Sequence, residues 1–349
     1  MFRRLQIGIG IAILVFVFAA ATPRTFSRAA SSSLAQNHDQ DFSRELLARA
    51  RVFPEIGPGV AAIKSDSSGR YYVLAEPATT ISIFQADGKR IGQIPNANSR
   101  GAKIVYAQDI DVDAKGRLFV ADRGANAVKI FKPDGSLDAT IAVAAPTSVV
   151  ALSGGDFAVA GLRASKLVSI FDSQGKFTRS FADPLPELGA SSRNPAAVPP
   201  RIYDGAEGHI YCVFNGLQNL ILRRYDRFGY ATYEASVSVS DFSPRGEAKP
   251  RTSIVIEQGA TPASMKPAIH ALAADPISQD VWAAVGDELV HFDRDGNRRA
   301  AYRTSTKDGA PIEASAILIE RNRILVASDP IGIFDFDLPE RMSPAAAQQ

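Results

Sequence analysis

Cysteine, tryptophan and methionine are scarce in this chain of 349 residues, which has one Cys, one Trp and three Met. The single cysteine, Cys212, excludes an intrachain disulfide framework, and it lies too far from the N-terminus to carry a lipid anchor there. An excess of charge of one sign is also missing, because 39 basic and 37 acidic residues leave a net charge of +2. This balance gives no indication of a nucleic-acid partner. Hydrophobic residues, at 46%, are ample for a large core.

Long apolar runs are missing except for one, from Ile7 to Ala21, which follows Arg3 and Arg4. A spanning helix needs about 20 apolar residues, so this run is short for one. A basic start, an apolar middle and a small-residue exit are typical of a secretory signal. We therefore expect residues 1–21 to be a signal peptide or, alternatively, an uncleaved N-terminal anchor. The rest of the protein is then expected to be extracytoplasmic, either periplasmic or secreted, with the membrane contacted only through this segment.

The segments that flank the main body carry no regular pattern. Residues 22–42 are rich in Ser, Ala and Gln and predict a disordered linker, and residues 341–349 predict a flexible tail. Between the linker and the main body, residues 43–50 (SRELLARA) favour a short helix capped by Ser43. The following segment, residues 51–56 (RVFPEI), is expected to be extended.

Residues 109–135 contain the pattern that organises the rest of the chain. Apolar and polar residues alternate in three short runs, DIDVD, LFVAD and AVKIF, which are separated by turns rich in Gly, Asn and Asp. This pattern predicts three consecutive antiparallel strands. Because one such meander cannot bury its own faces, repetition along the chain is expected.

The same pattern recurs in six copies. In each copy, both turns contain a glycine or another turn residue, and an aromatic residue precedes the second turn. The first-turn residues are Gly69, Gly116, Gly155, Gly208, Asp280 and Asn322, and the aromatics are Phe84, Phe131, Phe171, Tyr225, Phe292 and Phe334. A further extended run follows the second turn, so each unit has four strands with a period of roughly 40–50 residues, which is typical of a propeller blade.

This repeat predicts an all-β fold, a six-bladed β-propeller of four-stranded antiparallel blades over residues 43–340. The sixth copy lacks its fourth strand, and the extended RVFPEI segment could supply it. Closure of the ring by an N-terminal strand would remove exposed sheet edges. Two long connections, residues 184–200 and 240–266, interrupt the period, and long loops of this kind often shape binding sites.

The second copy resembles the NHL repeat. The residues that carry the likeness are Asp113, Gly116, the Val120-Ala121-Asp122 strand, Asn126, Ile130-Phe131 and the Asp134-Gly135 turn. The resemblance implies a six-bladed propeller, similar to bacterial extracytoplasmic propellers. It implies no activity, because one propeller fold carries many functions.

The three aspartates Asp109, Asp111 and Asp113 suggest calcium at first sight. An EF-hand loop needs a glycine at its sixth position and a glutamate at its twelfth, and these places hold Ala114 and Val120. We therefore expect Asp113, like Asp122 in the next turn, to accept hydrogen bonds from backbone N–H groups.

The resemblance implies two kinds of enzymatic relative. NHL-type lyases hold zinc through several histidines, and gluconolactonase-like propellers hold a metal through Glu, Asn and Asp. Of the four histidines, His38, His209, His270 and His291, only His270 begins an expected inner strand. The chain also has no G-x-S-x-G, Walker A or H-E-x-x-H motif. We expect no catalytic residues, no metal and no cofactor.

Candidate ligand-binding residues come from aligning the copies by their first turn. This alignment places a set of side chains at the start of the inner strands, where they could converge on the mouth of the central channel: Asp109, Ser148, Arg201, His270 or Ala271, and Ser315. Arg201 and Asp109 are the best suited to hold a small polar or anionic ligand. The alternative is that they pair with each other or with water.

The sequence therefore favours an exported, monomeric binding module that holds a protein, peptide or glycan at one face. A channel-centred metal-dependent hydrolase or lyase is the alternative, and a structural subunit of a larger envelope complex is a third hypothesis.

Overall fold

The computed structural model describes residues 44–163, 166–184, 200–205, 208–215, 219–238, 269–285, 287–328 and 332–339. The expected signal peptide (1–21), linker (22–42) and tail (341–349), His38, and most of the two long connections lie outside the described residues. Among the residues that are described, none forms a helix with the length and hydropathy needed to cross a membrane.

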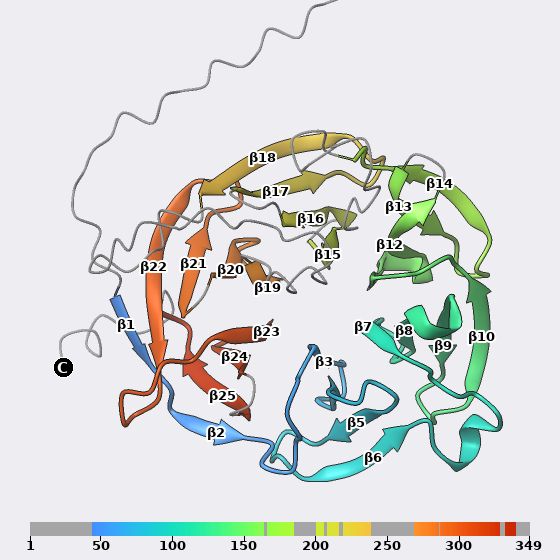
Figure 1. The fold of residues 1–349 in the computed structure, drawn as a ribbon, viewed down its shortest axis with the longest axis horizontal. Coiled ribbons are helices and arrows are strands. Elements are labelled where there is room, and N and C mark those ends of the chain that lie inside the picture. Colours follow the sequence, from blue (N-terminus) through green and yellow to red (C-terminus); the bar gives the residue numbers. More distant parts are fainter. Residues whose placement is uncertain are drawn as a thin grey trace, which may run out of the picture. The chain divides into compact units, whose positions relative to one another are not determined.

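The described strands form six sheets arranged in a ring (Figure 1). In the first four sheets the strands follow sequence order from the centre outwards, and in the last two an N-terminal strand is added at the outer edge. The first blade contains β3 (Ala62–Ser65), β4 (Tyr71–Leu74), β5 (Ile81–Phe84) and β6 (Arg90–Ile94). The second contains β7 (Ala107–Val112), β8 (Leu118–Asp122), β9 (Ala127–Phe131) and β10 (Leu137–Ala142). The third contains β11 (Ser148–Ala151), β12 (Phe157–Arg163), β13 (Lys166–Phe171) and β14 (Phe177–Phe181). The fourth blade contains β15 (Arg201–Asp204), β16 (Ile210–Asn215), β17 (Asn219–Tyr225) and β18 (Ala231–Ser238). The fifth contains β19 (Ile269–Ala274), β20 (Val281–Val285), β21 (Glu288–Phe292) and β22 (Arg298–Ser305). The sixth contains β23 (Ala314–Ile319), β24 (Arg323–Ser328), β25 (Gly332–Asp337) and β2 (Ala50–Val52). Among the described connections, three contain a short 3-10 turn: η1 (Ala97–Ser99), η2 (Arg123–Ala125) and η3 (Ser153–Gly155). The predicted six-bladed β-propeller is confirmed.

The ring closes through the N-terminal part of the propeller, as the sequence predicts. β2 pairs antiparallel with β25, with Arg51 opposite Phe334, and so becomes the outermost strand of the last blade. Figure 1 shows β2 beside β25 and next to the first blade. The two ends of the propeller therefore hold each other within one sheet.

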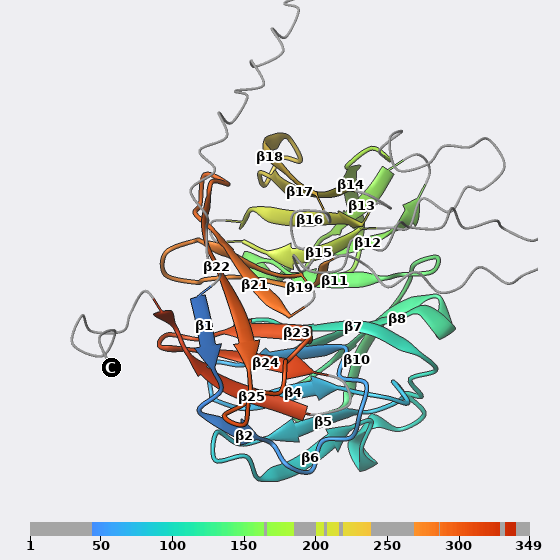
Figure 2. The same cartoon turned by 60° about the vertical axis from the view of Figure 1, so that its left-hand side comes forward.

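The prediction of a short helix over residues 43–50 is wrong. β1 (Arg44–Leu47) is a strand that pairs parallel with β22, so the fifth blade gains a fifth strand at its outer edge. Figure 2 shows β1 alongside β22. Leu46, which is 7% exposed, belongs to a buried cluster with Trp282 and Tyr302 of the fifth blade. Burial against this edge overrides the local preference for a helix.

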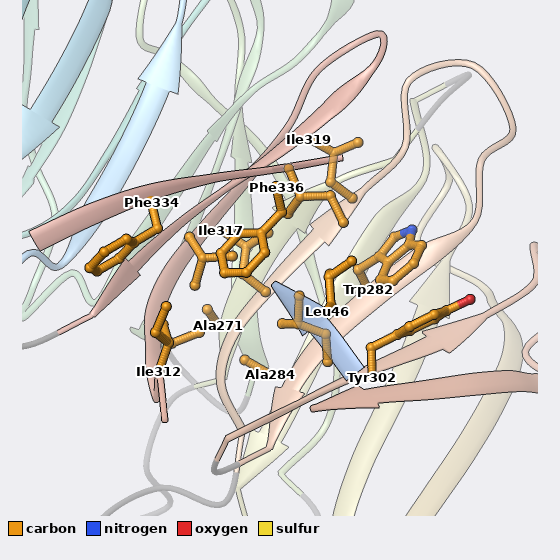
Figure 3. Packing of buried hydrophobic residues seen from close by; sticks show 14 of the residues in the cluster. Leu46, Ala271, Trp282, Ala284, Tyr302, Ile312, Ile317, Ile319, Phe334 and Phe336 are labelled. Atoms are coloured by element: carbon orange, nitrogen blue, oxygen red, sulfur yellow. The ribbon is translucent and has the colours of Figure 1, made fainter. Parts of the chain in front are cut away.

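The hydrophobic core consists of six clusters, one in each gap between neighbouring blades. Figure 3 shows the cluster between the fifth and sixth blades, where Trp282 and Tyr302 face Ile319 and Phe336. The predicted aromatics at the end of the third strand are buried in the first five blades. In the sixth blade Phe336, rather than Phe334, takes the equivalent place, because Phe336 pairs with Ile324 at the start of β24.

Candidate functional site

The six inner strands line the centre of the ring, and their register sets which side chains lie at the same level. Asp109 lies opposite Ala121, Ser148 opposite Ala160 and Arg201 opposite Val213 on the second strand of their blades. In the second, fifth and sixth blades the ladder shifts by one residue, which places Asp109, Ala271 and Ala316 at this level. His270 and Ser315 therefore lie at bulges rather than in regular pairing.

Asp109 and Ser148 meet directly and join the second blade to the third and fourth. Ser148 Oγ donates a hydrogen bond to Asp109 Oδ2 at 2.5 Å, and the backbone N–H of Val149 donates to the same oxygen at 3.3 Å. The backbone N–H of Ile202 donates to Ser148 Oγ at 3.2 Å. Ser148 is fully buried and Asp109 is 8% exposed. These two candidate residues already satisfy each other and the neighbouring backbone.

Lys64 and Asp111 form a second contact between inner strands, one level further along the channel. Lys64 Nζ lies 3.1 Å from Asp111 Oδ1, and the backbone N–H of Ala151 donates to Asp111 Oδ2 at 2.8 Å. Burial by itself would lower the pKa of Lys64, but the carboxylates of Asp111 and Asp109 raise it above its usual value. The ammonium group therefore stays charged and balances the aspartates around it.

Asp204 is the third carboxylate near this cluster. Part of the residue is exposed to solvent, yet its carboxyl group is surrounded by many protein atoms. This burial, together with the nearby Asp111 carboxylate, raises the pKa of Asp204 to about 7, against the opposing effect of Lys64. Burial likewise raises the pKa of Asp109, while Lys64 and Arg201 offset part of the rise. Both carboxyl groups therefore hold a proton more tightly than an aspartate in water does.

Arg201 spans the ring from the fourth blade to the first. Its Nη1 donates to the backbone carbonyl of Ala61 at 3.4 Å, and its guanidinium also interacts with the Tyr203 hydroxyl. The cavity beside Arg201 has a volume of only about 30 Å³. Its walls combine polar groups of the first, second and fourth blades with apolar groups of the fifth and sixth, including Lys64, Asp109, Arg201, Tyr203, Leu272 and Ile317. A space of this size holds about one water molecule.

The remaining two candidates do not join this cluster in the described structure. Ser315 Oγ donates to the backbone carbonyl of Ala327 in its own blade at 3.3 Å. His270 lies in β19, and its side chain is outside the described part of the structure. The structure thus brings Asp109, Ser148 and Arg201 to one level of the channel, and it adds three residues that the sequence analysis did not select: Lys64, Tyr203 and Asp204. Lys64 lies two residues before the turn aspartate Asp66, as Asp111 lies two residues before Asp113. An alignment of the copies on these turn aspartates could therefore have identified Lys64.

Asp113 and Asp122 have the structural roles expected for them. Asp113 Oδ1 accepts backbone N–H groups of Lys115 and Arg117 at 2.9 and 2.8 Å. Asp122 accepts the N–H of Ala125 at 3.2 Å in the following turn, and Lys129 Nζ also donates to it at 2.6 Å. Neither carboxylate is left for chemistry in the channel. Within the described ranges, no group of His, Cys, Asp and Glu side chains is arranged to hold a metal ion.

No protein-family model matches the chain, and no curated protein matches its sequence. Solved structures do resemble it. The WD40 repeats of RRP9 have a TM-score of 0.56 and 9% identity, over 84% of this chain and 99% of that one. Regucalcin from Agrobacterium tumefaciens, titled a calcium-binding protein, has a TM-score of 0.54 and 14% identity, over 85% and 95%. Virginiamycin B lyase from Staphylococcus aureus has a TM-score of 0.51 and 13% identity, over 83% and 98%.

The likeness is one of fold. At such low identity these neighbours establish the propeller architecture alone, and among them are an enzyme, a calcium-binding protein and a WD40 repeat domain. Function must therefore be argued from the side chains of this chain.

Proposed function

We propose that this protein is an exported, non-catalytic propeller that binds a protein, peptide or glycan at one face. The observation that carries the proposal is the narrow space between the described inner strands: the cavity beside Arg201, which residues of five blades line, is about 30 Å³. Asp109, Ser148 and Arg201 all make hydrogen bonds to groups of neighbouring or opposite blades. A substrate pocket typically has a volume of roughly 300–1,000 Å³, so binding at the surface fits this molecule better than turnover in the channel.

The alternative is a channel-centred, metal-dependent hydrolase or lyase. Such a site would need Asp109 to leave Ser148 and join other ligands around a metal ion. The hydrogen bonds of Asp109 to Ser148 and to the N–H groups of Ile110 and Val149 oppose this movement. A structural role in an envelope complex is the third hypothesis, and it would use the sides of the blades rather than the mouth.

A titration with calcium and zinc separates the two main hypotheses. We expect neither ion to raise the melting temperature of the purified protein, and no metal-dependent hydrolysis of lactones. The same protein is expected to bind a component of an extracytoplasmic extract in a saturable way. A metal-dependent rise in melting temperature that disappears in Asp109→Ala, but persists in the exposed-turn control Asp134→Ala, would favour the hydrolase.

Export is tested separately. A reporter enzyme that is active only outside the cytoplasm is fused after residue 42, with and without residues 1–21. Reporter activity that depends on those residues supports export, whereas equal activity from both fusions contradicts it.

A further inference from the structure

The turn between the third and fourth strands is built in the same way in three consecutive blades. Each begins with an aspartate, Asp172, Asp226 or Asp293, whose Oδ1 accepts the backbone N–H groups two and four residues further along. Each has a glycine of positive φ at the fourth position, such as Gly229 at +91°. Because the three turns share one backbone structure, differences between their side chains can be compared directly.

The third and fifth positions of this turn differ between the blades. Blade 3 has Gln174 and Lys176, and blade 5 has Asp295 and Asn297, whereas blade 4 has Phe228 and Tyr230. Phe228 is 60% exposed and Tyr230 is 73% exposed. Since polar residues support the same backbone in the neighbouring blades, the turn does not require these aromatics. Exposure of two aromatic side chains to water at one turn is unfavourable, and the backbone structure of the turn does not account for it.

Two arginines contact the aromatic turn, and a third, Arg224, lies on the strand that leads into it. The Arg227 guanidinium carbon lies 4.8 Å from the centre of the Phe228 ring. Arg179, on the neighbouring strand β14, donates to the Arg227 carbonyl, and Arg224 Nη1 donates to the Arg294 carbonyl at 2.7 Å. Arg224 Nε also donates to Thr232 Oγ1 at 2.8 Å, and its guanidinium lies over the Tyr233 ring. Within the described part of the chain, no carboxylate forms an ion pair with any of the three. The surface formed by Arg179, Arg224, Arg227, Phe228 and Tyr230 is called the arginine–aromatic turn below.

We propose that the arginine–aromatic turn docks an acidic segment of a partner protein. Phe, Tyr and Arg are enriched in protein interfaces and supply many of the residues that dominate binding energy. Arginines without carboxylate partners complement the charge of aspartate and glutamate side chains, to which they can donate paired hydrogen bonds. The turn joins the two outermost strands of blade 4, β17 and β18 (Figure 1), so this proposal does not rest on the channel mouth or on the function proposed for it.

The test uses a fluorescein-labelled copolymer of glutamate and tyrosine as the probe and measures anisotropy with the full-length protein. The main variant, Phe228→Gln with Tyr230→Lys, copies the blade 3 turn, so folding is expected to be preserved. This variant adds a positive charge and would strengthen purely electrostatic binding. We expect it instead to bind the probe about tenfold more weakly, as loss of interface anchors does.

Two further variants separate charge from general effects. Arg227→Ser, which copies Ser173 of blade 3, is expected to weaken binding and to flatten its salt dependence. Lys89→Ser removes a cation from the equivalent turn of blade 1 and is expected to leave affinity unchanged. Thermal melting of each variant confirms that it is folded.

Three results would overturn the proposal. They are no binding of the copolymer, equal binding by the aromatic-free variant, and preferential binding of polygalacturonate or of phosphatidylglycerol vesicles. The last result would assign the turn to a glycan or a membrane instead of a protein.

Discussion

The two sides of the channel differ in chemistry although the same strand repeat builds both. The inner strands of blades 1, 2 and 4 contribute Lys64, Asp109, Asp111 and Arg201, while those of blades 5 and 6 contribute small or apolar groups such as Leu272 and Ile317. The polar side is held by ion pairs and hydrogen bonds between blades, whereas Ile317 and Leu272 on the apolar side belong to hydrophobic clusters between blades. The repeat therefore sets the shape of the ring, and departures from it set the chemistry.

The largest effect is expected from removing the cation of the polar side. Lys64→Met leaves Asp111, which is 7% exposed, and Asp109 without their ammonium partner. Loss of one partner of a buried ion pair costs about 3 kcal/mol, and we expect that loss in urea denaturation. The exposed turn lysine variant Lys115→Met serves as the control. If both variants lose the same stability, the polar side is not held together by this pair.

A smaller loss is expected on the apolar side. Ile317, which is 7% exposed, packs between the fifth and sixth blades. Ile317→Ala should cost about 2–3 kcal/mol through the cavity that it leaves. Because no titratable group is removed, the loss should be the same at pH 5 and pH 8. A loss that changes with pH would show that the two sides of the channel are electrostatically coupled.

The link between Asp109 and Ser148 can be isolated by a double-mutant cycle. Asp109→Ala, Ser148→Ala and the double variant are compared by urea denaturation. Groups in direct contact couple by about 1 kcal/mol, and the 2.5 Å hydrogen bond predicts a coupling of that size. Additive losses would mean that each residue acts only through its backbone contacts.

The smallest effect concerns the protonation of Asp204. Its pKa is raised to about 7 in the folded protein, so the folded state binds the proton more tightly than the unfolded chain does. Stability is therefore lost as the pH rises from about 4 to 7, and Asp204→Asn removes this loss. The variant should match the wild type near pH 4 and exceed it at pH 8 by less than about 1 kcal/mol, because water screens the exposed part of the group. A variant that is less stable than the wild type at pH 8 would contradict the raised pKa.

Most of the fold was predictable because its determinants are local and repeated. Alternating strands, turn residues and buried aromatics recur in every copy, with glycine in the first turn of four of the six copies. The sixth copy lacked a fourth strand, which the RVFPEI segment could supply. The helix predicted over residues 43–50 was wrong because Leu46 is buried by partners more than 200 positions away, including Trp282. The candidate site was predictable only in part. Repeat alignment found Asp109, Ser148 and Arg201, but it could not show that Ser148 bonds to Asp109 or that Arg201 reaches Ala61.

The amino-acid sequence by itself determined the number of blades, the order of their strands and the segment that closes the ring, because hydrophobic period and turn chemistry are properties of short segments. Only the tertiary structure decided which charged side chains meet in the channel and how little space they leave. The reason is geometric: the ring places groups that lie far apart in the chain across the channel from each other, such as Arg201 and Ala61, and packing rather than spacing sets the distances between them.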